Sequence, residues 1–338
     1  MNNSMDVVYQ FNEKYAPYAG ASITSVITNN KDYDIRFHIL GEDLTKDSIS
    51  KLKSLESPKI TFVFYNTYDK IEEMKQMGLP NYRNSYAANL RMFLPELLDQ
   101  KIKRVLYLDA DTIVTKDISE LFCMNLESCC LAMVLDSLAG KHGVLIGMDE
   151  EDLYFNSGVI LFDLEKWRNE KLTEKIVNHI KCVRASYPSP DQDLINIDCK
   201  NKILLLPIDY NFQPIHRIVS TKCYQRTFSQ KKYYSNEHIE NAGREAKILH
   251  CFRFLGEFPW HKDNLHPFLK EFDTYLSISP WSHYKKRKAD CQLILKAEKV
   301  IYKILPHDIW GYIFYFVHSL FIYKTDMMCK KKQINKLM

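Results

Sequence analysis

The first half of the chain alternates between segments with the hydrophobic pattern of strands and segments with the pattern of helices. Short apolar runs rich in β-branched and aromatic residues, which are typical of buried strands, lie at 6–11, 34–40, 59–65 and 104–109. Apolar residues at helical spacing lie between them, at 17–30, 45–55 and 85–98. This alternation predicts βαβ units and a parallel sheet with helices on both faces.

Further apolar runs in the second half extend this pattern, at 129–136, 157–163 and 202–207. We therefore expect an α/β fold with one large domain at 1–283 and a distinct C-terminal region at 284–338. In open α/β sheets the ligand-binding crevice lies outside the carboxyl ends of the strands. The acids that follow the fourth run, in YLDADTIV, are therefore expected at the edge of that crevice.

The charge of the chain is unevenly distributed. The 338 residues carry a formal net charge of +4, yet the segment 284–338 holds 12 Lys and Arg against 4 Asp and Glu. This tail therefore carries +8 and the body about −4 by the same count. A mildly acidic body argues against nucleic-acid binding, and we expect the tail alone to contact an anionic partner.

The tail also holds a nearly unbroken apolar and aromatic run, IWGYIFYFVHSLFIY, at 309–323. The run is too short to span a bilayer, which takes about 20 residues. Basic clusters at 285–288 and 330–332 flank it, and lysines that bracket an aromatic helix favour the interface of an anionic membrane. A helix packed on the body, or an oligomer contact, is the alternative.

The compartment is indicated by the amino terminus and by the cysteines. The segment MNNSMDVVYQFNEKY lacks the basic start and the apolar run of a secretory signal. The nine cysteines are odd in number and include no C-x-x-C pair, so we expect reduced thiols rather than disulfides or a zinc site. These features predict a cytoplasmic protein that its tail holds peripherally at the inner face of the cell membrane.

The pair Asp109 and Asp111 places two like charges at the end of a buried strand. Their repulsion and desolvation are costly unless a cation or hydrogen bonds compensate. A turn with solvated acids is one interpretation. A second is the aspartyl nucleophile of haloacid-dehalogenase-type phosphatases, whose pattern RVLYLDADTIV fits, although three βα units precede it here. A third is a Mn²⁺ or Mg²⁺ site that bridges to a nucleotide diphosphate.

Seven motifs in order resemble a known family, the retaining glycosyltransferases of family 8, which includes bacterial lipopolysaccharide galactosyl- and glucosyltransferases and glycogenin. The resemblance covers roughly residues 6–262. The motifs are DVVYQFNEKYAPYAGASITSV, DIRFHIL, SYAANLRMFLPELL with KRVLYLDADTIV, YFNSGVILFDLEKWR, DQDLIN, DYNFQP and ILHCFRFLGEFPWHK. Each motif alone is weak evidence, whereas their order makes the set specific.

The resemblance implies a GT-A fold, a UDP-sugar donor and a divalent cation, Mn²⁺ or alternatively Mg²⁺, that bridges the two phosphates. Asp109 and Asp111 would ligate the cation, and His250 would complete the ligand set. Without the resemblance, a lone histidine in the apolar run ILHCF is more often a core residue than a ligand.

The resemblance also implies roles in substrate binding. The donor-binding residues would be Asn12, Tyr15, Arg91, Asp109 and Asn156. Gln192, near the anomeric carbon, and Asp191, beside the sugar ring, are the catalytic candidates, and Asp136 would hold sugar or acceptor hydroxyls. Each of these residues also has an ordinary structural interpretation, since Asp191, for example, could cap a helix.

One position departs from the family pattern. The family commonly has a lysine before Pro-Trp that binds the diphosphate, whereas Phe258 stands there in this chain. An aromatic ring cannot make a charged contact to the leaving group. We therefore expect Arg253, or else Lys262, to supply that contact in the donor site.

The sequence thus predicts a retaining enzyme that moves a hexose, galactose or glucose, from a UDP-sugar to a hydroxyl of a glycan acceptor. The acceptor would be a lipopolysaccharide, capsule or glycoprotein glycan, and a lipid-linked acceptor fits the predicted membrane tail. Two alternatives remain at this stage: the aspartyl-nucleophile phosphatase, and a UDP-sugar-binding protein with decayed catalysis, which the missing lysine motivates.

Overall fold

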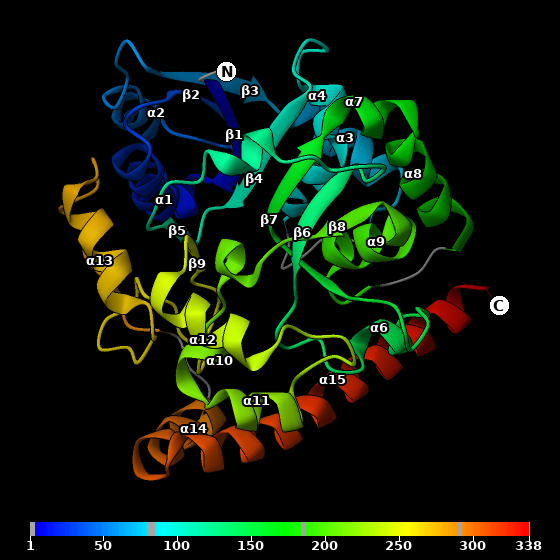
Figure 1. Ribbon diagram of the computed structural model, residues 1–338. Helices are drawn as coiled ribbons and strands as arrows, with labels where there is room; N and C mark the ends of the chain where they lie inside the picture. The colour runs from blue at the N-terminus through cyan, green and yellow to red at the C-terminus, as the bar shows by residue number, and fades with distance from the viewer. Residues whose placement is uncertain (1–3, 80–84, 184–186, 290–292, 338) are drawn as a thin grey trace.

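A seven-stranded sheet with the strand order β3-β2-β1-β4-β7-β6-β8 forms the centre of the protein (Figure 1). The computed structural model describes residues 4–79, 85–183, 187–289 and 293–337. The strands of this sheet are β1 (Ser4–Asn12), β2 (Asp34–Glu42), β3 (Ile60–Asn66), β4 (Arg104–Asp109), β6 (Leu131–Leu135), β7 (Phe155–Asp163) and β8 (Ile203–Leu205). All the strands predicted from apolar runs are confirmed, with ends that shift by at most two residues.

The strands of this sheet are parallel to one another except for β7. β1 pairs in parallel with β2 and β4, β2 with β3, and β6 with β8, whereas β7 is antiparallel to both β4 and β6. The predicted parallel sheet is therefore wrong at this strand, because an apolar run carries no signal of its direction. The reversal places the amino end of β7 at the same sheet edge as the carboxyl ends of β4 and β6.

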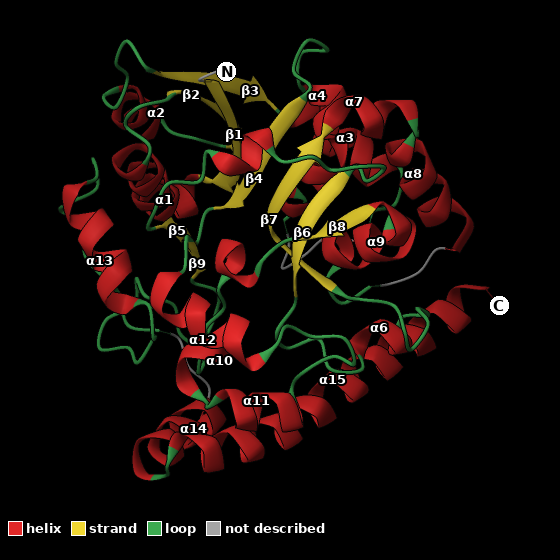
Figure 2. Ribbon diagram, in the orientation of Figure 1, coloured by secondary structure: helices red, strands yellow, loops and turns green. Residues whose placement is uncertain are grey.

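Helices flank the sheet on both sides of the view in Figure 2. The α-helices are α1 (Ala16–Asn29), α2 (Lys46–Lys53), α3 (Tyr68–Gln76), α4 (Leu94–Leu97), α5 (Glu120–Cys123), α6 (His142–Leu145), α7 (Leu164–Asn169), α8 (Leu172–Val183), α9 (Pro190–Asp198), α10 (Ile215–Ile218), α11 (Thr221–Thr227), α12 (Asn236–Glu245), α13 (Leu269–Ile278), α14 (Leu293–Ile304) and α15 (His307–Leu337). The 3₁₀ helices are η1 (Glu13–Tyr15), η2 (Ala87–Phe93), η3 (Lys200–Lys202) and η4 (Ile208–Asn211). The helix predicted at 85–98 is η2 followed by α4, which has Pro95 in its first turn, where a missing N–H loses no hydrogen bond.

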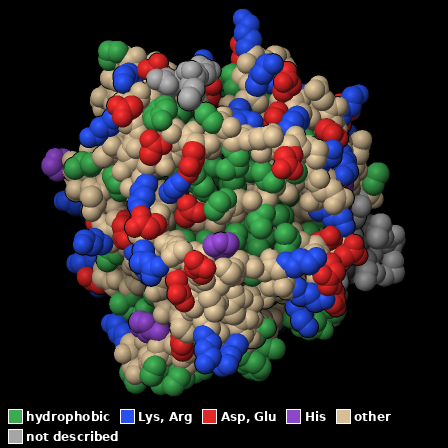
Figure 3. All heavy atoms as spheres, viewed as in Figure 1, with side chains coloured by type: hydrophobic (Ala, Val, Ile, Leu, Met, Phe, Trp, Pro, Cys, Tyr) green, Lys and Arg blue, Asp and Glu red, His purple; other side chains and the backbone are tan. Residues whose placement is uncertain are grey.

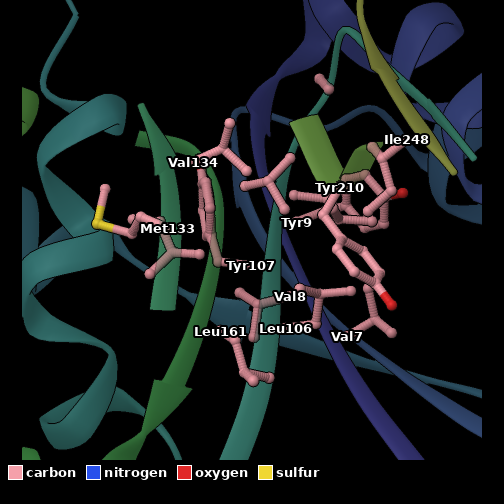
Figure 4. Packing of buried hydrophobic residues seen from close by; sticks show 14 of the residues in the cluster. Val7, Val8, Tyr9, Leu106, Tyr107, Met133, Val134, Leu161, Tyr210 and Ile248 are labelled. Carbon is pink, nitrogen blue, oxygen red and sulfur yellow. The ribbon is translucent and has the colours of Figure 1, made fainter. Parts of the chain in front are cut away.

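The central strands form the core because they are covered on both faces. Val7, Val8 and Tyr9 of β1 lie beside Leu106 and Tyr107 of β4, and all five side chains are fully buried (Figure 4). Strands buried on both faces have continuous apolar runs, which explains the absence of a polar alternation in these segments of the sequence. The cysteines whose side chains are described are all free thiols, as the sequence predicted.

A separate two-stranded sheet brings a distant segment to the edge of the main sheet. β5 (Thr112–Val114) follows β4 after a turn and pairs antiparallel with β9 (Ile248–His250). In this register Thr112 lies opposite His250, and the N–H of Cys251 donates to the carbonyl oxygen of Asp111 at 2.7 Å. The pairing therefore places His250 beside Asp111, although the two residues are far apart in the sequence.

The C-terminal region forms α14 and α15, and one face of α15 packs on the body (Figure 1). Trp310 is 1% exposed, and Asp308 accepts hydrogen bonds from the N–H and the hydroxyl of Ser220 at 2.7 and 2.6 Å. A Cβ atom on Gly311 would lie 2.7 Å from Cγ1 of Val219, so a larger residue would push the helix away. Packing on the body is therefore confirmed for this face of the helix.

The opposite face of α15 exposes a broad apolar stripe at helical spacing. The stripe consists of Ile309, Tyr312, Ile313, Phe316, Val317, Leu320 and Phe321. Figure 3 shows hydrophobic side chains along the lower edge of the view, where α14 and α15 lie. Among the described residues, no helix has the length and apolar character needed to cross a membrane. The side chains of the basic cluster at 330–332 lie outside the described part of the structure.

Candidate active site

Two adjoining cavities at one edge of the sheet are lined by almost all of the predicted site residues. The first, of about 340 Å³, is lined by Tyr15, Arg91, Asp109, Asp111, Asp136, Asn156, Asp191, Gln192, His250, Arg253 and Phe258, together with five others. The second, of about 740 Å³, extends from the same acids to Asn12 at the carboxyl end of β1. Lys262 is exposed and lines neither cavity.

Asp109, Asp111 and His250 converge at the junction of the two cavities. Nε2 of His250 lies 3.4 Å from Oδ1 of Asp111 and 3.8 Å from Oδ2 of Asp109. One ligand atom from each residue lies within 4.8 Å of the other two. Two hard carboxylate oxygens and one imidazole nitrogen at this spacing fit a divalent cation such as Mn²⁺ or Mg²⁺.

Hydrogen bonds orient two of these three side chains toward the shared position. The hydroxyl of Tyr107 and Nη2 of Arg91 donate to Oδ1 of Asp109 at 2.7 and 2.9 Å, which leaves Oδ2 facing His250. Nδ1 of His250 lies 3.1 Å from Oδ1 of Asn211, an acceptor, so Nδ1 carries a proton and the other ring nitrogen, Nε2, faces the acids. Burial lowers the pKa of His250, but the carboxylates of Asp111 and Asp109 outweigh burial and raise the pKa above its usual value.

Arg91 connects the cluster to the acid on α9. Its side chain is nearly fully buried, donates to Asp109, and has Nε 3.2 Å from Oδ2 of Asp191. Nη1 donates to the carbonyl oxygen of Ser157 at 2.6 Å, and Cζ lies 4.4 Å from the centre of the Tyr107 ring. Burial lowers the pKa of Arg91, but Asp109, Tyr107 and Asp191 together raise it by more. The net pKa lies above its usual value, so the guanidinium stays charged. One buried cation thus balances carboxylates from β4 and α9.

Asp191 and Gln192 lie in the first turn of α9 and face the first cavity. Burial raises the pKa of the Asp191 carboxyl above its usual value, although Arg91 acts in the opposite direction. Oε1 of Gln192 accepts from the N–H of Ser157 at 3.0 Å, and Nε2 donates to Oδ2 of Asp136 at 3.2 Å. The acid and the amide are therefore both held by hydrogen bonds at the wall of the cavity.

A chain of amide groups links Asp136 to His250. Nδ2 of Asn156 donates to Oδ2 of Asp136 at 3.0 Å, and Nδ2 of Asn211 donates to Oδ1 of Asn156 at 2.9 Å. Asn211 in turn accepts from His250. Asp136 directly follows β6 and Asn156 lies at the start of β7, so the antiparallel pairing of these strands brings the two side chains together.

The carboxyl end of β1 lines the second cavity with unpaired acceptors. Oε1 of Gln10 and Oδ1 of Asn12 are buried and have no hydrogen-bond partner among the described residues. Both residues line the second cavity, and Tyr15 lies where it meets the first. Buried acceptors without partners favour a ligand that donates hydrogen bonds to them.

The loop after β9 contains the departure from the family pattern. The ring of Phe258 stacks on that of Trp260, with 4.4 Å between the ring centres, and lines both cavities. Of the two cations expected to replace the lysine, Arg253 lines the first cavity and Lys262 does not. Lys14, which the sequence analysis did not single out, lines the second cavity.

Three further residues of the site were missed from the sequence. Tyr107 and Ser157 lie in apolar strands, where a single polar side chain is easily taken for part of the core. Asn211 lies in the motif DYNFQP, to which no role was given. A signal existed for Tyr107, because it precedes Asp109 by two residues and side chains two apart lie on the same face of a strand.

Comparison with known proteins agrees with this geometry. Residues 6–264 match the profile of the family described as "Glycosyl transferase family 8". The chain belongs to glycosyltransferase family 8. This family 8 chain is 30% identical over 316 residues to the lipopolysaccharide 1,2-glucosyltransferase of Escherichia coli K12, covering 91% of the chain and 88% of the relative. It is 26% identical to the lipopolysaccharide 1,3-galactosyltransferase of Salmonella typhimurium LT2, covering 83% and 80%.

Solved structures of similar proteins establish the fold of this family 8 chain. The galactosyltransferase LgtC in complex with donor and acceptor sugar analogues has a TM-score of 0.65 and 25% identity, covering 81% of this chain and 96% of LgtC. The bifunctional glycosyltransferase WbbM has a TM-score of 0.68 and 20% identity, covering 84% of this chain and 51% of WbbM, and its likeness shows the fold alone. The predicted GT-A fold is confirmed.

Replacement of Gly158 tests His250 as a ligand. A Cβ atom at Gly158 would lie 2.1 Å from Cε1 of the His250 ring, so Gly158→Ala should displace the imidazole. We expect Mn²⁺ binding, measured by isothermal titration calorimetry, to weaken by roughly 10-fold or more. Gly143→Ala is the matched control, because its Cβ would meet no atom closer than Sδ of Met148 at 3.5 Å. Equal Mn²⁺ affinity in the two variants would contradict this role for His250.

Proposed function

We propose that the protein is a retaining glycosyltransferase that moves a hexose, galactose or glucose, from a UDP-sugar to a hydroxyl of a glycan acceptor. One observation carries the proposal: in a family 8 chain, the ligand atoms of Asp109, Asp111 and His250 converge within 4.8 Å where two cavities meet. A donor consists of a nucleoside and a sugar joined by a diphosphate. The cluster therefore lies where that diphosphate would connect the contents of the two cavities.

The second cavity suits the nucleoside of the donor. The unpaired oxygens of Gln10 and Asn12 would accept hydrogen bonds from the N–H of a base or from ribose hydroxyls. Tyr15 offers an aromatic surface at the boundary of the cavity, and its own ring is supported edge-on by Tyr18 and Trp260. A pyrimidine such as uracil matches this combination of acceptors and ring.

Asp109, Asp111 and His250 would hold a divalent cation, Mn²⁺ or Mg²⁺, beside the diphosphate. Such a cation, when bound, stabilises the negative charge that develops on the departing UDP. The chain supplies the orientation, because Arg91 and Tyr107 hold one oxygen of Asp109 and leave the other directed at the site. Preorganised ligands need no rearrangement as the charge develops.

The first cavity suits the sugar and the acceptor hydroxyl. Gln192 would lie near the anomeric carbon on the face opposite the leaving UDP, with Asp191 beside the sugar ring. Asp136 and Asn156 present acceptor and donor groups that sugar hydroxyls can match. Retention requires the acceptor to approach from the face that UDP leaves, where the departing phosphate can accept its proton. No covalent nucleophile is assigned.

Family membership removes the aspartyl-phosphatase alternative, because residues 6–264 match a glycosyltransferase profile and β4 is not the first strand of the chain. A UDP-sugar-binding protein with decayed catalysis is the remaining alternative. Binding of a UDP-sugar does not distinguish such a protein from an active enzyme, whereas release of UDP does.

The proposed donor chemistry is tested with a panel of UDP-sugars and Mn²⁺. We expect UDP-glucose or UDP-galactose to raise the melting temperature and to release UDP in a metal-dependent way. Asp111→Asn should abolish UDP release, because it removes a ligand charge, and Asp117→Asn, at an exposed acid outside the cavities, should retain it. Absence of stabilisation by every UDP-sugar would contradict the proposal, and stabilisation without turnover would favour the decayed protein.

Arg253 is proposed to replace the lysine missing at Phe258. Its exposed side chain lines the first cavity, as Asp109, Asp111 and His250 do, and a guanidinium in this cavity could contact the diphosphate. Arg253→Ala should lower kcat/KM for the UDP-sugar by roughly 10- to 100-fold, because a charged hydrogen bond is lost. Exposed Arg226 lies outside both cavities, so Arg226→Ala is the control. A loss in Lys262→Ala with full activity in Arg253→Ala would assign the role to Lys262 instead.

We also propose that the acceptor is a lipid-linked glycan and that residues 285–338 bring the enzyme to the inner face of an anionic membrane. The exposed apolar stripe of α15 covers about half of the helix circumference, which is wider than the narrow seam of a coiled coil. Exposed Lys285, Lys288, Lys296 and Lys303 add positive charge along the same region. An amphipathic, basic and aromatic surface of this kind fits the interface of a bilayer.

Membrane docking is measured by co-sedimentation of the full chain with phosphatidylglycerol-containing vesicles. Phe316→Ser combined with Leu320→Ser should lower binding by roughly 10-fold or more, because both side chains are more than half exposed and would lose apolar burial in lipid. Tyr68→Ser, at an equally exposed ring on α3, is the control. Undiminished binding by the double variant would rule out the stripe as the docking surface.

A further inference from the structure

Next to Gln192, a fully buried carboxylate collects three hydrogen bonds. Asp193 lies in α9 with an exposed fraction of 0%. Its Oδ1 lies 2.7 Å from Nε2 of His142 and accepts from the hydroxyl of Tyr154, and its Oδ2 accepts from the N–H of Ser189 at 2.9 Å. The predicted site did not include Asp193, Tyr154 or His142, and none of the three lines either cavity. Their contact with the first cavity is therefore through a neighbouring residue that lines it.

That neighbour is the carboxamide of Gln192, because the hydroxyl of Tyr154 has only one proton to give. Burial raises the pKa of Tyr154 well above its usual value, so the group stays a hydroxyl, and its proton is directed to Asp193. The hydroxyl oxygen can therefore only accept, and Nε2 of Gln192 lies 3.1 Å from it. Asp193 thus determines which end of the carboxamide faces Tyr154.

The other contacts of Gln192 require the same orientation. Nε2 also donates to Oδ2 of Asp136 at 3.2 Å, and Oε1 accepts from the N–H of Ser157 at 3.0 Å. A flipped carboxamide would place its oxygen against the carboxylate of Asp136 and its NH₂ against the N–H of Ser157, so every pair would mismatch. If Asp136 turns to substrate hydroxyls, Tyr154 becomes the partner that still holds Nε2 in place.

We propose that Asp193, Tyr154 and His142 are positioning residues that fix the orientation of the Gln192 carboxamide in the first cavity. The inference rests on the proposed function for its catalytic meaning, since Gln192 would lie beside the anomeric carbon. The orientation of the Gln192 carboxamide itself follows from its hydrogen bonds and does not depend on the proposed function. His142 belongs to α6, so the contact of its Nε2 with Oδ1 of Asp193 joins α6 to α9.

The same helix contains a matched control. At the carboxyl end of α9, Oδ1 of Asp198 lies 3.0 Å from Nδ1 of His179, and Nε2 of His179 lies 2.8 Å from the hydroxyl of Tyr187. This second cluster has the same three residue types and a buried acid, but its tyrosine hydroxyl bonds His179, whereas that of Tyr154 bonds Gln192 in the cavity wall. Disruption of either cluster should lower the stability of the protein. Only disruption of the Asp193 cluster should also change the site.

The test compares Tyr154→Phe with Tyr187→Phe in the full chain. We expect Tyr154→Phe to lower kcat for UDP-sugar turnover on the order of 100-fold while KM for the donor changes little, because the amide is misplaced and the donor contacts remain. Tyr187→Phe should leave both constants unchanged. His142→Gln, which can still donate to Asp193, should retain more activity than His142→Leu. Equal kcat in Tyr154→Phe and Tyr187→Phe would overturn the proposal.

Nuclear magnetic resonance measures the orientation of the Gln192 carboxamide independently of enzyme turnover. The side-chain NH₂ signals of Gln192, assigned by their loss in Gln192→Glu, should shift and exchange faster with solvent in Tyr154→Phe and stay unchanged in Tyr187→Phe. Unchanged signals in Tyr154→Phe would overturn the positioning role whatever the activity. Shifted signals in a protein that turns over no UDP-sugar would support the positioning of the amide and contradict the proposed function instead.

Discussion

A single buried guanidinium, that of Arg91, is the interaction on which the arrangement of the site depends. Carboxylates at the end of β4 and at the start of α9 approach each other at the sheet edge, where burial makes uncompensated charge costly. Arg91 donates to Asp109, lies within 3.2 Å of Asp191, and binds the backbone of β7 through Ser157. It therefore sets the position of the cluster relative to the residues that would contact the sugar.

The parts of the site that follow from local sequence were predictable, and those that follow from strand direction were not. Asp109 and Asp111 were expected at the sheet edge because they directly follow an apolar run. His250 could be named only through the family resemblance, since its position depends on the pairing of β5 with β9, which no local pattern reveals. Asn156 was named in the same way, and the reason for its position is the reversed direction of β7, which the sequence pattern did not show.

The C-terminal region illustrates the same limit and also borders the site. Its apolar run predicted either a membrane surface or packing on the body, and α15 packs with Trp310 while it exposes Phe316 on the other face. Which face of the helix packs on the body depends on the shape of the surface beneath it, and the hydrophobic pattern of the sequence does not reveal that shape. Nε2 of His318 on α15 lies 3.3 Å from the carbonyl oxygen of Leu138, which lines the first cavity. The helix proposed to meet the membrane thus contacts a residue in the wall of the cavity proposed to hold the sugar and the acceptor hydroxyl.

The affinity of Mn²⁺ for Arg91→Lys tests most directly whether one guanidinium organises the site. A lysine keeps the charge but cannot contact Asp109, Asp191 and Ser157 at once. We expect Mn²⁺ binding, measured by calorimetry, to weaken by roughly 10- to 100-fold although no metal ligand has changed. Arg104→Lys is the control, because Arg104 donates to the backbone carbonyl oxygens of Phe122 and Met124 and lines neither cavity. Unaltered Mn²⁺ affinity in Arg91→Lys would contradict the account.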